Sequence, residues 1–180
     1  MYRAVDAEIA AFQDATGLGC PTGCGHCCET QTPYVNVADM EPIARDLVAR
    51  GAGETVYDHA VAAVSGTPCV LYEPGRLPGG CTEYELRPML CRLFGFGAVR
   101  DKHGQARLAL CRIHGREVPE AAARAVAFVD GGGAVPSFAD WQAEADAVAP
   151  DGLREQMPIN EALARALERE LLRARYQADG

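Results

Sequence analysis

The chain has 180 residues, of which 48% are hydrophobic and 23% charged, an ordinary composition for a globular protein with one hydrophobic core. Its formal net charge of −8 argues against nucleic acid or an anionic membrane as the main partner, because both repel an acidic protein. No window approaches the roughly 18 consecutive apolar residues of a transmembrane helix, and residues 1–8 lack the apolar core of a secretory signal. We therefore expect a cytoplasmic protein that forms a single domain over residues 1–180.

Hydrophobic residues recur at intervals of three and four in six segments, which is the pattern of amphipathic helices. The predicted helices cover residues 2–16, 39–50, 54–65, 119–130, 138–148 and 159–176. Gly17 ends the first helix, and Asp39 is the predicted N-cap of the second, since a short acidic side chain can accept a hydrogen bond from a first-turn N–H. Pro88 favours the first turn of a further short helix over residues 88–94.

Residues 66–116 lose the helical periodicity and are rich in proline, glycine and cysteine. Short strands are predicted at residues 33–37, 69–72, 96–99 and 107–111. A turn at residues 101–104 would pair the last two strands, and turns within residues 74–80 would bring Cys81 back toward Cys69. The predicted fold is α+β and mainly α, with a loop-rich metal module that contains short β-hairpins and is surrounded by five or six helices.

Eight cysteines lie between residues 20 and 111, and four of them fall within the nine residues 20–28. A cation or an iron–sulfur cluster explains this crowding, because several thiolates must then converge on one point. We expect residues 20–28 to form a loop, and in a reducing compartment thiolate ligation explains the even count better than disulfides. The predicted metal ligands are Cys20, Cys24, Cys27, Cys28, Cys69, Cys81, Cys91 and Cys111.

Two arginines, Arg87 and Arg92, lie near Cys91 in the sequence. Arginine offsets the charge of clustered thiolates and donates N–H groups to sulfur, so both are candidates to support a bound cofactor. Ion pairs with Glu83 and Glu85 on a solvated surface would explain the two arginines equally well.

The cysteine segments combine into a specific pattern. It consists of Cys24-Gly25-His26-Cys27-Cys28, Cys81-Thr82-Glu83-Tyr84, Arg87-Pro88 and Cys91-Arg92. This pattern resembles the YkgJ-type cysteine-cluster family, also called the CxxCxxCC domain and described as zinc- or iron-chelating. The resemblance covers residues 20–115, includes Cys69 and implies metal ligation. It departs at one spacing, because three residues instead of two separate Cys20 from Cys24. The flagellin lysine N-methylases share a similar cysteine pattern, which implies an iron–sulfur cluster and modification of a peptide.

The cysteine spacing favours an iron–sulfur cluster over zinc. Structural zinc sites usually take two separated C-x₂₋₄-C pairs, and no second C-x-x-C pair follows that of Cys24 and Cys27. A dense segment completed by distant single cysteines is closer to cluster ligation, and eight thiols suffice for two sites or for one site with spare thiols. His114, which forms a C-x-x-H arrangement with Cys111, and His26 are the less favoured candidates for a mixed site.

The sequence thus predicts a cytoplasmic metal-binding protein that holds an iron–sulfur cluster, or iron, through clustered thiolates. Residues 20–115 are the expected metal-binding module and residues 116–180 a helical extension. One alternative is a structural zinc module with Zn²⁺ and a partner-binding helical tail. Another is a metal-dependent enzyme that modifies a protein or peptide side chain. An open coordination position would favour the enzyme, and closed four-thiolate geometry would favour the structural module.

Overall fold

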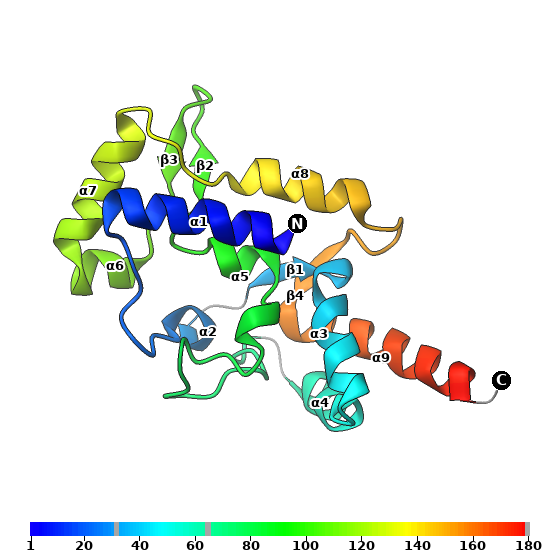
Figure 1. The fold of residues 1–180 in the computed structure, drawn as a ribbon. Coiled ribbons are helices and arrows are strands. Elements are labelled where there is room, and N and C mark those ends of the chain that lie inside the picture. Colours follow the sequence, from blue (N-terminus) through cyan, green and yellow to red (C-terminus); the bar gives the residue numbers. More distant parts are fainter. Residues whose placement is uncertain (31–32, 64–65, 179–180) are drawn as a thin grey trace. The chain divides into compact units, whose positions relative to one another are not determined.

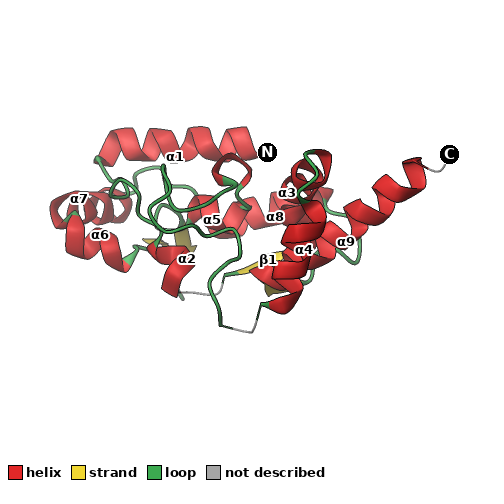
Figure 2. Ribbon diagram, turned by 90° about the horizontal axis from the view of Figure 1, so that it is seen from below, coloured by secondary structure: helices red, strands yellow, loops and turns green. Residues whose placement is uncertain are grey.

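Helices dominate the computed structural model, which describes residues 1–30, 33–63 and 66–178 (Figure 1). In chain order the elements are α1 (Tyr2–Thr16), α2 (His26–Thr30), β1 (Tyr34–Asn36), α3 (Val37–Ala49), α4 (Gly53–Ala62), the 3-10 helix η1 (Tyr84–Leu86), α5 (Met89–Leu93), β2 (Ala98–Arg100), β3 (Ala106–Leu108), α6 (Arg112–Glu117), α7 (Pro119–Asp130), α8 (Phe138–Val148), β4 (Gln156–Pro158) and α9 (Ile159–Ala178). Within the described residues the named strands form two antiparallel pairs, β1 with β4 and β2 with β3. Most of the ribbon coloured by secondary structure is helix (Figure 2). This confirms the predicted α+β, mainly α class.

The chain divides into two compact units, and each unit is assembled from two separate segments. Unit 1 comprises residues 1–24 and 89–148, and unit 2 comprises residues 25–88 and 149–180. Segments far apart in the sequence therefore fold together within each unit. That the whole chain acts as one domain, with a module over residues 20–115 and an extension after it, stays a prediction.

The core of unit 1 forms where α1 packs against α5 and α7. Helix α1 buries Val5, Ile9 and Phe12, the apolar stripe that its sequence predicts. Gly17 ends the helix as predicted, because its φ of 70° is a conformation that a glycine adopts without strain. Leu93 of α5 is fully buried in the same core, and burying a side chain of this size contributes roughly 1.5–3 kcal/mol.

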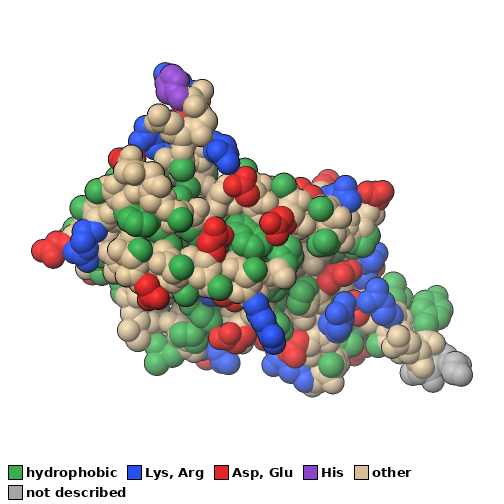
Figure 3. Space-filling view, turned by 45° about the horizontal axis from the view of Figure 1, so that its top comes forward, with side chains coloured by type: hydrophobic (Ala, Val, Ile, Leu, Met, Phe, Trp, Pro, Cys, Tyr) green, Lys and Arg blue, Asp and Glu red, His purple; other side chains and the backbone are tan. Residues whose placement is uncertain are grey.

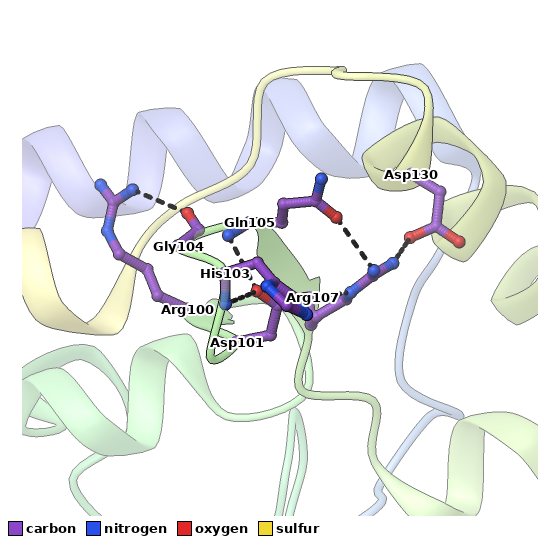
Figure 4. A network of polar contacts seen from close by, with 7 residues as sticks. All are labelled: Arg100, Asp101, His103, Gly104, Gln105, Arg107 and Asp130. Carbon is purple, nitrogen blue, oxygen red and sulfur yellow. Dashed lines mark hydrogen bonds and ion pairs between the residues drawn. The ribbon is translucent and has the colours of Figure 1, made fainter.

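The β2–β3 hairpin of unit 1 is closed by the side chain of Asp101 (Figure 4). Its carboxylate accepts hydrogen bonds from the backbone N–H groups of His103 (2.8 Å) and Gln105 (3.0 Å) and pairs with Arg107. These partners, the His103 N–H first, hold the pKa of Asp101 below its usual value. Arg107 also reaches Asp130 of α7 at 2.7 Å, which ties the hairpin to that helix. The predicted turn at residues 101–104 is confirmed.

Unit 2 is organised by α9, which packs against α3 and α4. Leu163 and Leu167 are fully buried, as the predicted leucine stripe of this helix requires. Strand β4, which the sequence did not reveal, pairs with β1 so that Val35 lies opposite Met157. Helix α4 ends at Ala62, and the final predicted positions of that helix, residues 64–65, lie outside the described residues.

Two local predictions in unit 2 are wrong. The N-cap of α3 is Asn36 rather than Asp39, because the Asn36 side chain accepts a hydrogen bond from the Asp39 N–H at 2.8 Å. The helix therefore starts at Val37, earlier than predicted. Residues 69–72 do not form a strand, and an isolated bridge joins Tyr72 to Cys81 instead. The turn between them nevertheless returns the chain as predicted, since the Thr82 N–H donates to the carbonyl of Leu71 at 2.9 Å.

Acidic and basic side chains are interspersed over the face drawn in Figure 3. Along α9, Arg165 pairs with Glu161 at 2.8 Å and Arg175 pairs with Glu54 at 3.1 Å. No helix within residues 1–30, 33–63 and 66–178 has the length and apolar character needed to cross a membrane.

Replacing Asn36 by Ala should lower the free energy of unfolding by about 1 kcal/mol, because the buried Asp39 N–H loses its acceptor. Asn36→Ser is the matched control, since its hydroxyl can still cap the helix. The measurement is urea unfolding followed by far-ultraviolet circular dichroism. Equal stability of the Ala and Ser variants would contradict the capping role.

Candidate metal centre

The structure sorts the eight cysteines four and four between the two units. Unit 2 holds Cys27, Cys28, Cys69 and Cys81, and unit 1 holds Cys20, Cys24, Cys91 and Cys111. None of these cysteines, all of which lie in described segments, is joined in a disulfide. The sorting depends on the division of the chain between Cys24 and Gly25, inside the dense cysteine run.

The prediction that residues 20–28 form a loop is wrong for their second part. Cys27 and Cys28 lie in α2, and the Cys28 N–H donates to the carbonyl of Gly25 at 2.9 Å. Successive side chains of a helix diverge by about 100°, yet the sulfur atoms of Cys27 and Cys28 remain 4.0 Å apart. A tetrahedral ion with metal–sulfur bonds of about 2.3 Å separates its sulfur ligands by about 3.8 Å. The pair is therefore spaced to bind one metal.

Two glycines allow α2 to approach the turn that carries Cys69 and Cys81. A Cβ on Gly25 would lie 2.4 Å from Cε2 of Tyr72, and a Cβ on Gly80 would lie 2.9 Å from the same atom. A Cβ on Gly80 would also lie only 3.1 Å from the Cα of Gly25. Backbone thus meets backbone here, which is possible only without side chains. This close approach brings the two cysteine segments of unit 2 together.

The thiols of unit 2 perturb one another. The hydrogen bond with Cys28 lowers the pKa of Cys27 to about 6, helped by backbone N–H groups and the charge of Arg87 and opposed by burial. Burial raises the pKa of Cys69 to about 12, and the charges of Cys81 and Cys27 act in the same direction. Burial also raises the pKa of Cys81. A bound cation would supply the positive charge that allows all four thiols to ionise.

The two candidate arginines lie in different units and have different surroundings. The guanidinium of Arg87 lies 3.4 Å above the ring centre of Tyr84. Its charge helps to lower the pKa of Cys27 and opposes the rise in the pKa of Cys81 that burial causes. Arg92 is buried in unit 1, where its Nη1 donates to Asp6 at 2.7 Å and its guanidinium lies over the ring of Tyr2. Arg87 is thus the arginine that acts on the thiols of unit 2, whereas Arg92 joins α5 to α1.

A further candidate ligand, His114, lies in unit 1. It is fully buried on α6, and its Nε2 is 3.3 Å from the sulfur of Cys20. Burial lowers the pKa of His114, opposed by the backbone of Gly95, so the imidazole is neutral at pH 7, as a metal ligand must be. The C-x-x-H spacing between Cys111 and His114 is the sequence signal for this candidate, which was less favoured than the cysteines.

The cysteine sulfurs and the His114 imidazole are donor groups that bind metals, but their spacing is not that of a complete metal site. Within the described parts of the chain, no three His, Cys, Asp or Glu side chains are arranged to hold one ion. Thiolates and neutral imidazole are the ligands that zinc and iron prefer. His114 Nδ1 is moreover a buried polar atom without a hydrogen-bond partner in the described structure. The residues of both units therefore fit a soft or borderline metal.

Clustered thiols without disulfides are the donor groups that thiolate metal-chelating proteins use. A family model described as "CxxCxxCC: Putative zinc- or iron-chelating domain" matches residues 19–112, which is more than half of the chain. The chain belongs to this family, as the resemblance predicted. No curated protein and no solved structure matches it.

Thiol alkylation of the reduced, metal-free chain should distinguish Cys27 from Cys69. With a pKa of about 6, Cys27 is mostly thiolate at pH 7, and its labelling should slow as the pH falls through 6. Cys69, buried and with a pKa of about 12, stays protonated and should be labelled last. The measurement is pulse labelling with iodoacetamide followed by peptide mass spectrometry. Unfolding in urea, the control, should equalise the two rates, and equal rates in the folded chain would contradict this assignment.

Proposed function

We propose that this chain is a metal-binding protein in which Cys27, Cys28, Cys69 and Cys81 hold an iron–sulfur cluster or iron. The observation that carries the proposal is the close approach of Gly25 to Gly80, which brings the helix that carries Cys27 beside the turn between Cys69 and Cys81. Cys28 joins them through its contact with Cys27. Thiolate ligands persist in a reducing compartment, so we propose the cytoplasm as the place of action.

The spacing of these four cysteines supports a cluster. Two ligands are adjacent on α2 and two are single residues on a distant turn, whereas structural zinc sites usually use two separated C-x₂₋₄-C pairs. Cluster ligation accepts one dense segment completed by distant cysteines. Arg87 would reduce the net negative charge of four thiolates around the bound group.

Structural zinc is the second candidate, because the sulfurs of Cys27 and Cys28 are 4.0 Å apart, close to the roughly 3.8 Å between two sulfur ligands of one tetrahedral zinc ion. In either case the metal would join α2 to the Cys69–Cys81 turn, so that binding energy becomes folding energy for this part of unit 2.

Anaerobic purification of the whole chain should give a coloured protein that contains iron and acid-labile sulfide. Cys27→Ser and Cys69→Ser should each lower the iron content at least tenfold, because each removes one thiolate from the proposed set. Metal analysis and the visible absorption spectrum provide the measurement. A colourless protein with stoichiometric zinc in unit 2 would replace the cluster by the second candidate. A chain whose unit-2 variants retain the wild-type metal content would overturn both.

Gly25→Ala should weaken metal retention and destabilise the chain by about 1–3 kcal/mol, because its Cβ would collide with Tyr72. Gly19→Ala is the matched control, since a Cβ at that position meets no atom within 4 Å. Metal content after dialysis and thermal unfolding monitored by circular dichroism are measured for both variants. Equal behaviour of the two would mean that the close approach of α2 to the turn does not position the ligands.

A further inference from the structure

One contact between candidate ligands within unit 1 joins a cysteine to a histidine that lies 94 residues later in the chain. Cys20 Sγ and His114 Nε2 are 3.3 Å apart. Metal–sulfur bonds of about 2.3 Å and metal–nitrogen bonds of about 2.0 Å at a tetrahedral angle put these two atoms about 3.5 Å apart. The pair is therefore already spaced as two ligands of one tetrahedral ion.

The buried ring of His114 is oriented as that of a metal ligand would be. Its Nε2 faces Cys20, and its Nδ1 faces Gly95, where a Cβ would lie 3.4 Å from this nitrogen. A histidine that binds metal through one nitrogen usually directs its other N–H toward a carbonyl or carboxylate. Nδ1 lies against the backbone of Gly95 without a hydrogen bond of standard geometry, and Nε2 is the ring nitrogen directed at a cysteine sulfur.

Gly95 also brings Cys111 beside the same ring. With a φ of +85°, it occupies a conformation that favours glycine, and a Cβ there would lie 2.8 Å from His114 Cε1 and 3.2 Å from Cys111 Cβ. Cys111 precedes α6 and His114 lies three residues later, so both side chains point to one side of this turn. Rotation of the Cys111 side chain about its Cα–Cβ bond can move the sulfur without moving the backbone.

Cys24 is the candidate fourth ligand, from the segment that carries Cys20. The Cys24 N–H donates to the carbonyl of Pro21 at 3.0 Å, and Gly23 has a φ of 73°, so residues 20–24 form a tight turn with a cysteine at each end. Cys20 and Cys24 then form a C-x₃-C pair, and Cys111 and His114 form a C-x-x-H pair. Two separated pairs of this spacing are the usual ligand arrangement of structural zinc.

We propose that unit 1 contains a second metal centre, separate from that of unit 2, in which Cys20, Cys24, Cys111 and His114 bind a zinc-type divalent cation. His114 lies beyond the family match, which ends at residue 112. The three-residue spacing between Cys20 and Cys24 is then a zinc-binding turn rather than a defect in the cluster motif. This centre does not depend on the identity of the metal in unit 2.

Cobalt(II) titration of the reduced, metal-free full chain tests the proposal, because tetrahedral cobalt reports its ligands by visible and thiolate charge-transfer absorption. His114→Ala should weaken one cobalt site at least tenfold, and Cys24→Ser should lower its charge-transfer absorption by about one third, since three thiolates contribute. Cys69→Ser, which disrupts unit 2, should leave this site intact. His103→Ala is the matched control, because it removes an exposed imidazole from the β2–β3 hairpin of the same unit.

A second pair of variants separates ligand position from backbone strain. Gly95→Ala should weaken the cobalt site, whereas Gly104→Ala should not, although both glycines have positive φ. Only at Gly95 would the Cβ collide with His114 and Cys111, while at Gly104 it meets no atom within 4 Å. Circular dichroism of each variant establishes that it is folded.

Unchanged cobalt affinity and spectrum in His114→Ala would overturn the second centre. Loss of one and the same cobalt ion in both His114→Ala and Cys69→Ser would also overturn it, because the two units would then share a site. Neither result would overturn metal binding by unit 2, which depends on the Cys27 and Cys69 variants. Both proposals would be supported if the Cys27 and Cys69 variants lost only the metal of unit 2 and His114→Ala weakened only the cobalt site of unit 1.

Discussion

Mutual repulsion is the constraint that the thiols of Cys27, Cys28, Cys69 and Cys81 would meet if all of them ionised. Two unit charges 4 Å apart repel by about 4 kcal/mol at an effective dielectric constant of about 20, and the sulfurs of Cys27 and Cys28 are 4.0 Å apart. The thiols of Cys27 and Cys69 differ, because the hydrogen bond with Cys28 lowers the pKa of Cys27 whereas burial raises the pKa of Cys69. Such a group is stable as a set of thiolates only around a positive charge. The glycine contacts at positions 25 and 80 bring it together nonetheless.

The interleaving of the chain explains why cysteines that are adjacent in sequence can serve different sites. The division after Cys24 assigns the first part of the cysteine run to the unit that contains α6, and the second part to the unit that contains the Cys69–Cys81 turn. Cys20 and Cys24 therefore share a unit with Cys111 and His114, residues almost 90 positions later. A run that reads as one motif therefore contributes cysteines to two compact units.

The sequence predicted those features that depend on local patterns. The faces of α1 and α9 followed from apolar residues at helical spacing, such as Phe12 and Leu163, because burial of a continuous stripe determines which side of a helix faces the core. The turn at Asp101 followed from residue types that bond to their own backbone. Family membership followed from the spacing of the cysteines.

The remaining features depend on tertiary contacts that local patterns do not encode. Asn36 and Asp39 are both good N-caps, and the pairing of β1 with β4 decides where α3 begins. Strand β4 has only three residues, too few for a periodicity. The orientation of His114 toward Cys20, and the separation of the cysteines into two groups, arise from packing between segments about 90 residues apart.

The position of α9 in the chain has a consequence for synthesis on the ribosome. Helices α3 and α4 are complete by Ala62, but their apolar partner α9 begins only at Ile159, after every residue of unit 1 has been made. At a synthesis rate of roughly 5–20 residues per second, the apolar side chains of Met40, Ile43 and Leu47 remain without their partner helix α9 for on the order of 5–20 seconds. Unit 1 can fold during this interval, whereas unit 2 cannot complete its fold until α9 has been made. Metal capture by Cys27, Cys28, Cys69 and Cys81, all synthesised before α9, would give the waiting segment an early constraint.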